Sequence, residues 1–397
     1  MAKPSKIEIM SIKIMEMDYT RCTGCGACVS SCLQKALSLQ YNEEGFYHPF
    51  INAEVCVNCG ACDKVCHALH NEQPIAPSRN YTAYMLKSKD ASIVAKSSSG
   101  GAFSLMADNV IKQGGVVWGA RYNYDKERLE HCSTDECSLD DLRKSKYIES
   151  YMGNSFTKVR QQLKEGRKVM FVGTPCQVEG LHTFLSVRKA DTTNLLLVRF
   201  VCHGVPSNKF FTEYKRYEEA KRGSKMIRFD FRPKTRGWRN SDWQMWFENG
   251  YEEHKPYYYY YYYYYFQLNN LLRSSCYHCH RVFHEIADIT IADFWGIHSF
   301  RPENRDQEGI SVALVHSSKG KDAIKAIKNN CNMEEIPASA IDYIYDEATS
   351  RQDNSIKRIK TMQQVKKRGY MYVAKKELRY PMLKMRLKDL LKSIIKR

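Results

Sequence analysis

Short apolar stretches alternate with helical patterns along most of this sequence. Seven stretches are typical of strands because they are rich in β-branched and aromatic residues: they cover 81–86, 115–121, 168–173, 194–201, 226–232, 286–292 and 309–316. Apolar residues recur at helical spacing between some of them, at 101–113, 155–165, 176–187, 207–222 and 318–329. This order predicts a mixed α/β (or α+β) body.

The segment before this body has a different pattern, a duplicated cysteine motif. C-x2-C-x2-C-x3-C occurs at 22–32 and again at 56–66. A 4Fe–4S cube needs four thiolates, and in two-cluster ferredoxins the fourth cysteine of each run binds the other cluster. The predicted ligand sets are therefore Cys22, Cys25, Cys28 with Cys66, and Cys56, Cys59, Cys62 with Cys32. Two zinc sites are the alternative, although zinc sites usually pair separated C-x2-C units.

Four further cysteines are candidates for a third 4Fe–4S cluster. Cys176 and Cys202 each follow a predicted strand, and Cys276 and Cys279 form the motif C-Y-H-C. Two other interpretations remain open. Cys176, with its thiolate favoured at a helix N-terminus, could pair with His203 as a nucleophile, or the cysteines could be small buried apolar residues.

A serine- and glycine-rich loop, residues 97–104, leads into the helix predicted at 101–113. Free amides at a helix N-terminus favour a phosphate, and an ordinary serine N-cap is equally consistent with the pattern. No dinucleotide fingerprint, P-loop or hydrolase elbow is present. Clusters carry single electrons whereas most organic acceptors take two, so a ferredoxin unit joined to a phosphate-binding body predicts a flavin.

The charge is concentrated at the C-terminus. The 397 residues carry a net charge of +17, but residues 355–397 hold 15 Lys or Arg and 2 Asp or Glu, a net of +13. The nearly neutral remainder argues against a nucleic-acid-binding body. The tail also predicts a helix beginning near Pro381, with one apolar stripe formed by Leu383, Leu387, Leu390, Leu391, Ile394 and Ile395. That helix could pack on the body, contact an anionic membrane through 381–397, or dock on a protein partner.

Nine consecutive tyrosines at 257–265 precede Cys276. They could form a ring-stacking wall beside a planar cofactor, or be a low-complexity expansion in which two or three rings pack. No stretch approaches the roughly 18 apolar residues of a membrane span, and no secretory signal is evident. A cytoplasmic protein is therefore expected, with possible peripheral contact at the inner membrane surface.

At several motifs the sequence resembles the coenzyme F420 hydrogenase/dehydrogenase beta-subunit family, over most of residues 20–320. The matching motifs are S-S-G-G-A-F-S (98–104), S-K-Y-I-E-S (145–150), G-x-x-V-M-F-V-G-T-P-C-Q-V-E-G-L (166–181), C-H-G-V-P-S (202–207), F-R-P-K-T-R-G-W (231–238), R-S-S-C-Y-H-C (273–279) and A-D-F-W-G (292–296). The resemblance implies FAD held by Ser98, Ser99, Gly100, Gly101, Lys146, Tyr147, Thr174 and Pro175. It places the third cluster on Cys176, Cys202, Cys276 and Cys279, and it gives Lys234, Trp238 and Asp293 as catalytic candidates near the flavin or substrate.

These observations predict four parts: a two-cluster ferredoxin domain (1–72), a flavin-binding region (73–190), a region with the third cluster (191–350) and a basic helical tail (351–397). The expected function is an iron–sulfur flavoprotein oxidoreductase. It would pass electrons from a ferredoxin-type donor through 4Fe–4S clusters to FAD, and then to a small organic acceptor such as a deazaflavin. A non-catalytic electron-transfer subunit and, more weakly, a Cys–His acyl-transfer enzyme are the alternatives.

Overall fold

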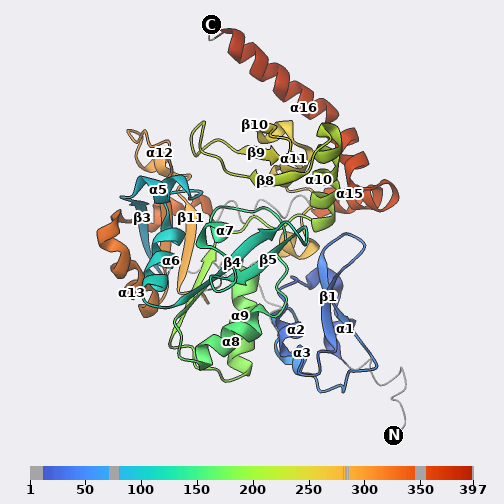
Figure 1. The fold of residues 1–397 in the computed structure, drawn as a ribbon, viewed down its shortest axis with the longest axis vertical. Helices are drawn as coiled ribbons and strands as arrows, with labels where there is room; N and C mark the ends of the chain where they lie inside the picture. The colour runs from blue at the N-terminus through green and yellow to red at the C-terminus, as the bar shows by residue number, and fades with distance from the viewer. Residues whose placement is uncertain are drawn as a thin grey trace.

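A computed structural model describes residues 12–70, 80–279, 281, 284, 286–344 and 355–395, with side chains described up to residue 391. Residues 73–80, with two prolines, are typical of a linker between domains, and all but residue 80 lie outside the described residues. Figure 1 shows an N-terminal unit beside a central sheet, and a smaller sheet next to the C-terminal helices. The predicted mixed α/β class is confirmed.

The N-terminal unit repeats its cysteine motif in its structure. Two short helices, α2 (Ala27–Ser31) and α3 (Ala61–Lys64), each begin after a glycine with left-handed backbone, Gly26 at φ 77° and Gly60 at φ 66°. Only glycine adopts this conformation at little cost, so both turns depend on it. The antiparallel hairpin β1 (Leu37–Tyr41) and β2 (Tyr47–Ile51) lies between them, and α1 (Lys13–Glu16) and α4 (His67–His70) complete the unit.

The central sheet has eight strands in the order β13-β3-β12-β11-β7-β6-β4-β5. Their bounds are β3 Thr82–Ser88, β4 Val116–Asn123, β5 Arg128–Ser133, β6 Val169–Gly173, β7 Leu195–Phe200, β11 Ile289–Asp293, β12 Ser311–Val315 and β13 Cys331–Ile336. The pairs β4–β6, β6–β7 and β7–β11 are parallel, and the others are antiparallel. This sheet crosses the predicted boundary at residue 190, because β6 pairs with β7.

Helices cover both faces of the central sheet (Figure 1). On one face, α6 (Ala102–Lys112) and α13 (Ser318–Ile327) pack on residues such as Val117 and Met170. On the other face, α8 (Ser155–Lys164) and α9 (Pro175–Val187) pack on Trp118 and Phe171, the residues that directly follow Val117 and Met170 in the chain. Alternate strand residues therefore face opposite apolar layers, as in a sheet buried on both sides. The remaining helices of this part are α5 (Ala91–Ala95), α7 (Leu139–Leu142) and α12 (Ile297–Phe300).

The smaller sheet is antiparallel, in the order β10-β9-β8, and packs with the tyrosine run. Its strands are β8 (Met226–Asp230), β9 (Asp242–Phe247) and β10 (Glu252–Pro256), with α10 (Asn208–Arg222) and α11 (Tyr261–Gln267) against them. Four rings of the run are fully buried, namely Tyr260, Tyr262, Tyr263 and Tyr265. Each hydroxyl is hydrogen-bonded, to Trp243 O, Tyr147 O, Phe231 O and Glu377 respectively. More rings pack than the two or three expected for a low-complexity expansion, and the run forms part of this core.

The C-terminal tail forms two helices, α15 (Ser355–Arg368) and α16 (Tyr370–Ile395). The prediction of a helix beginning near Pro381 was wrong, because Pro381 lies inside α16. Leu378 and Met382, one on each side of Pro381, are buried in the core that contains the tyrosine run. Their packing offsets the backbone hydrogen bond that proline cannot make. No helix among the described residues is both long and apolar enough to span a membrane.

Candidate functional site: a cavity at the carboxyl ends of parallel strands

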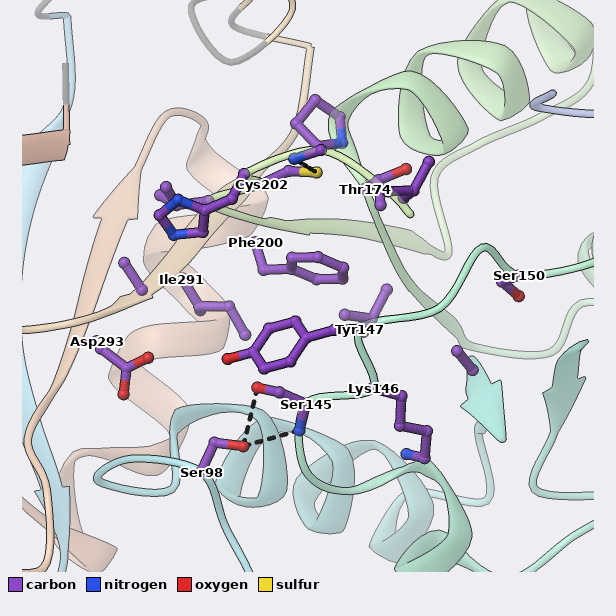
Figure 2. Close-up of a pocket in the computed structure, with 18 of the residues that line it drawn as sticks. Ser98, Ser145, Lys146, Tyr147, Ser150, Thr174, Phe200, Cys202, Ile291 and Asp293 are labelled. Atoms are coloured by element: carbon purple, nitrogen blue, oxygen red, sulfur yellow. Dashed lines mark hydrogen bonds between the residues drawn. The ribbon is translucent and has the colours of Figure 1, made fainter. Parts of the chain in front are cut away.

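The main cavity lies where three neighbouring parallel strands end. β6 leads into Thr174, β7 leads into Val201, and β11 ends at Asp293; all three residues line a cavity of about 630 Å³. Carboxyl ends of parallel strands meet at one edge of a sheet, the usual place for a ligand in such folds. Figure 2 shows Thr174, Cys202, Tyr147 and Asp293 around this space. Its volume is in the range of small-molecule and cofactor sites.

All four candidate ligands of the third cluster line this cavity: Cys176, Cys202, Cys276 and Cys279. Burial and, to a smaller extent, the charges of Cys279 and Cys276 raise the pKa of the Cys176 thiol to about 12, although its hydrogen bond with Thr174 lowers it. The expected stabilisation of a Cys176 thiolate by the helix N-terminus is therefore outweighed, which disfavours an activated nucleophile. The backbone N–H of Gly204 donates to Cys202 Sγ at 3.4 Å.

The same N–H···S geometry recurs in the ferredoxin unit. Gly24 N donates to Cys22 Sγ and Asn58 N to Cys56 Sγ, each at 3.4 Å and each from the residue two positions after the cysteine. Such bonds stabilise a metal-bound thiolate and tune cluster potentials. Cys202 thus shares a local geometry with the first cysteine of each ferredoxin run, which supports its assignment as a ligand.

The serine–glycine loop brings the N-terminus of α6 to the cavity. The N-cap is Gly101, in left-handed conformation at φ 97°, which has no side chain to cap the helix, and Ala102 N donates to Ser311 Oγ of β12 at 3.5 Å. The simple alternative of a serine N-cap is thus not what this loop forms. Ser98 lines the cavity and accepts a hydrogen bond from Ser145 N at 2.8 Å (Figure 2), whereas Ser99 donates to Ile310 O at 2.6 Å.

Two lysines and two aromatic rings line the cavity next to this helix. Lys144 pairs with Asp230, and burial lowers the pKa of Lys146 to about 8. Tyr147 stacks on Phe266, with ring centroids 4.5 Å apart, and both rings line the cavity. A helix N-terminus, cationic side chains and a flat aromatic surface together fit a phosphorylated, planar cofactor.

The predicted cofactor-binding residues reach this cavity with one exception. Those that line it are Ser98, Ser99, Gly101, Lys146, Tyr147, Thr174 and Pro175. Gly100 is not among the lining residues; a Cβ there would lie 2.4 Å from Leu86 O, so this glycine allows the loop to pass close to β3.

Of the three catalytic candidates, only Asp293 lines the cavity. Its Oδ2 pairs with Arg232 at 3.2 Å, and its buried Oδ1 has no hydrogen-bond partner among the described residues. Lys234 instead donates to Val94 O and Ser99 O, both at 2.7 Å, and thereby holds the serine–glycine loop. Trp238 is buried and stacks on Trp295, with centroids 4.7 Å apart.

Three lining residues, Lys144, Arg232 and Trp295, were not among the predicted site residues. Trp295 lies in the motif A-D-F-W-G, and Lys144 directly precedes S-K-Y-I-E-S, so the sequence carried a signal for both. The guanidinium of Arg232 lies 4.8 Å from the centre of the Trp295 ring. Arg232 lies in the motif F-R-P-K-T-R-G-W, so the sequence carried a signal for it too, and its Nη2 donates to Trp238 O of the same motif at 3.0 Å.

The first predicted ferredoxin set shares a second, small cavity, lined by Cys22, Cys25, Cys28 and Cys66. Burial raises the pKa of the Cys28 thiol, and the charges of Cys25, Cys22 and Cys66 raise it further, so the four thiols are electrostatic neighbours. The second set is less enclosed. Cys62 is buried, Cys32 and Cys56 pack against the same apolar cluster, and Cys59 is exposed.

Helix α9 joins the two regions. A Cβ on Gly180 would lie 2.9 Å from Cys25 Sγ, so the absence of a side chain lets the helix approach this thiol. Burial, together with smaller contributions from the charges of Cys66 and Cys176, raises the pKa of Cys25 to about 12. Cys176 lies in the first turn of α9, and the first ferredoxin set is therefore adjacent to the cysteines of the main cavity.

Within the described residues, no three His, Cys, Asp or Glu side chains converge tightly enough to bind one metal ion. A cubane holds its four thiolates on separate iron atoms. The shared cavity, the N–H···S bonds and the left-handed glycines fit that arrangement of ligands.

Comparison with known proteins agrees with the resemblance. Residues 166–340 match the model for the C terminus of the coenzyme F420 hydrogenase/dehydrogenase beta subunit, and residues 21–68 match the 4Fe–4S dicluster domain. The chain thus joins a region that matches a 4Fe–4S dicluster domain to a region that matches the C terminus of this family's beta subunit. The second match supports the predicted 4Fe–4S sites of the N-terminal unit.

Two individual proteins are similar to part of this chain at low sequence identity. A Methanocaldococcus jannaschii protein described as uncharacterised is 29% identical over 199 residues, covering 43% of this chain and 54% of its own length. The chain therefore spans about half of that relative. A chain of the F420-reducing NiFe hydrogenase complex from Methanosarcina barkeri is 16% identical, with a TM-score of 0.47 over 72% of this chain and 94% of its own.

Proposed function

We propose that this chain is an iron–sulfur flavoprotein oxidoreductase. Electrons from a ferredoxin-type donor would enter at the exposed Cys59 edge and pass through the two ferredoxin clusters. They would continue to a cluster on Cys176, Cys202, Cys276 and Cys279, and then through FAD to a small organic acceptor of the deazaflavin type. The observation that carries the proposal is the main cavity, where these four thiols, the N-terminus of α6 and cationic side chains meet.

Each group in the lining has a task in this scheme. The amides at the start of α6, with Lys144 and Lys146, would bind phosphate oxygens. Tyr147 would lie against a planar ring, and Phe200 and Ile291 would keep water from it. The unpartnered Asp293 Oδ1 would accept a hydrogen bond from an N–H of the cofactor or substrate. FAD, when bound, would convert one-electron delivery into two-electron reduction of the acceptor.

Composition of the anaerobically purified protein tests the proposal. Three cubanes and one flavin predict roughly twelve iron atoms and one FAD per chain. About eight iron atoms per chain together with FAD would exclude the third cluster. A preparation replete in iron but without flavin would contradict the flavoprotein and leave a non-catalytic electron-transfer subunit.

A cysteine variant separates the third cluster from the first two. Cys176→Ser should lose about four iron atoms and its donor-driven acceptor reduction, while it keeps the ferredoxin clusters. Cys331→Ser is the matched control, since Cys331 is buried on β13 and its thiol donates to Ile327 O. Equal iron content in the two variants would assign Cys176 to the apolar core.

A further inference from the structure

The C-terminal half of α16 extends away from the molecule while its first half is anchored (Figure 1). Tyr370, Val373, Ala374, Leu378 and Met382 are buried against the tyrosine run. Beyond Met382 the helix continues to Ile395. The exposed part is thus a continuation of a helix already fixed to the core.

The contacts of α16 with the tyrosine run fix which side of this helix faces the body. The Tyr258 hydroxyl donates to Asp389. Arg386 donates to Tyr259 O at 3.2 Å, and its guanidinium lies 4.9 Å from the centre of the Tyr259 ring. Residues 382, 386 and 389 recur at helical spacing, so they define one face.

The apolar stripe of the tail lies on another face and points to solvent. Its described side chains are between 51% and 59% exposed, namely Leu383, Leu387, Leu390 and Leu391. The described part of the stripe is therefore not packed on the body, which contradicts the alternative of a helix that buries its stripe there. A row of exposed leucines at i, i+4, i+7 and i+8 costs free energy in water and marks an interaction surface.

The charges around the stripe indicate which kind of partner would bind to it. Lys384 and Lys388 are exposed beside it, and residues 379–397 contain seven Lys or Arg and one Asp. Two copies of this helix pairing their stripes would bring like charges together, whereas anionic headgroups would neutralise them. Tyr380, 74% exposed at the start of this segment, suits the headgroup region of a bilayer.

We propose that residues 381–397 bind the surface of an anionic lipid bilayer. The leucine stripe would enter the boundary between headgroups and acyl chains, with the lysines among the headgroups. The helix would lie on the membrane without crossing it and hold the redox domains at its surface. This proposal rests on the tail alone and is independent of the acceptor.

Flotation with lipid vesicles tests it on the full-length, cluster-containing protein. We expect binding to vesicles of equal parts phosphatidylglycerol and phosphatidylcholine, and little binding to phosphatidylcholine alone. Leu387→Ser with Leu391→Ser should abolish binding. The matched control, Ile227→Ser with Val187→Ser, removes two apolar side chains of 53% and 42% exposure elsewhere on the surface and should bind normally.

Charge variants test the second half of the argument. Lys384→Gln with Lys388→Gln should weaken binding roughly tenfold or more, since each basic residue near an anionic surface contributes substantially. Lys112→Gln with Lys221→Gln makes the same change in net charge at exposed positions elsewhere and should have no effect. All these positions are exposed, so an unchanged visible spectrum and urea midpoint will show that folding is intact.

Equal binding to neutral and anionic vesicles, or full binding by the Leu387→Ser, Leu391→Ser variant, would overturn the proposal. Sedimentation velocity supplies a further check. Concentration-dependent dimers that the same variant abolishes, with no vesicle binding by the parent protein, would assign the stripe to a second copy instead.

Discussion

Arg273 links the body to the ferredoxin unit, and its removal should be costly. Nη1 donates to Cys22 O at 3.1 Å and Nη2 to Tyr47 O at 2.7 Å, and Nη2 also pairs with Glu149. The side chains of Arg273 and Glu149 are 3% and 5% exposed. The substitution Arg273→Met keeps much of the volume and removes the charge and its hydrogen bonds.

The magnitude follows from what remains after the substitution. Glu149 would keep hydrogen bonds from Tyr47 N at 3.0 Å and Asn208 Nδ2 at 3.3 Å, but it would lose its cation in a buried site. Removing one partner of a buried ion pair typically costs about 3–5 kcal/mol. The free energy of unfolding should fall by about that amount, with the loss centred on the contact between the ferredoxin unit and the body.

Urea unfolding under anaerobic conditions, followed by near-UV circular dichroism, measures this loss. Hydrogen exchange of the amides in residues 20–48 should locate it. Arg301→Met is the matched control, because Arg301 and its partner Glu334 are 36% and 45% exposed. An exposed pair of this kind contributes less than about 1 kcal/mol.

Equal losses in the two variants would refute the argument that the buried pair holds the ferredoxin unit. The double variant Glu149→Gln, Arg273→Met adds a second check. It should recover part of the loss, since it no longer buries an unpaired carboxylate. Without any recovery, the loss in the free energy of unfolding would come instead from the carbonyls of Cys22 and Tyr47, which lose the hydrogen bonds from Arg273.

Three further predictions concern the helix contact, the cavity and the buried histidines. Gly180→Ala places a Cβ 2.9 Å from Cys25 Sγ. Overpacking should lower the free energy of unfolding by about 1–3 kcal/mol, measured by urea unfolding, and should slow donor-driven reduction, measured by stopped flow. Wild-type behaviour in both assays would contradict the close approach. Lys146→Met should weaken FAD retention about tenfold or more. Since burial lowers the pKa of Lys146 to about 8, FAD binding by the wild type should weaken as the pH rises through 8. Equilibrium dialysis measures both effects, with Lys96→Met, at an exposed lysine, as the control. Burial lowers the pKa of His131 and His316 to about 4, so between pH 6.5 and 4 only the unfolded chain binds those protons. As the pH falls through this range, the free energy of unfolding should decrease by about 1.4 kcal/mol per pH unit for each histidine. His316→Gln should flatten this slope in urea titrations, and an unchanged slope would show that His316 is protonated in the fold.

Hydrophobic periodicity predicted the body well where elements are buried on both sides. All seven predicted strands and all five predicted helices form, within a few residues of their expected ends. The strands that were missed are edge or hairpin strands, such as β5, β10 and β13. β10 reads E-E-H-K-P, and β13 reads C-N-M-E-E-I. Strands with this many polar and charged residues show no apolar alternation, so their pairing determines them. β5 and β10 pair with the strand directly before them, and β13 pairs with the distant β3.

The candidate site divides in the same way. Cysteine spacing is local, and the first ferredoxin set indeed lines one small cavity. Lys234 and Trp238, expected near the flavin or substrate, lie behind the lining, since the fold directs Lys234 to the backbone of the loop that carries Ser99. Arg273 and Glu149 are 124 residues apart, and no local pattern predicts their pairing.

The basic tail is not one feature, and the structure separates its charges by task. Arg358 of α15 is buried and pairs with Glu44 of the ferredoxin unit, and the Tyr370 hydroxyl donates to Glu44 O at 2.6 Å. Met362 and Val365 pack in the core with the tyrosine run. α15 and the first half of α16 therefore hold the ferredoxin unit and the smaller sheet together, because their contacts are buried and specific. In the described part of the tail, the segment after Met382 carries a row of four exposed leucines next to exposed lysines. A partner could therefore dock on this segment without disturbing the buried contacts of α15 and of the first half of α16.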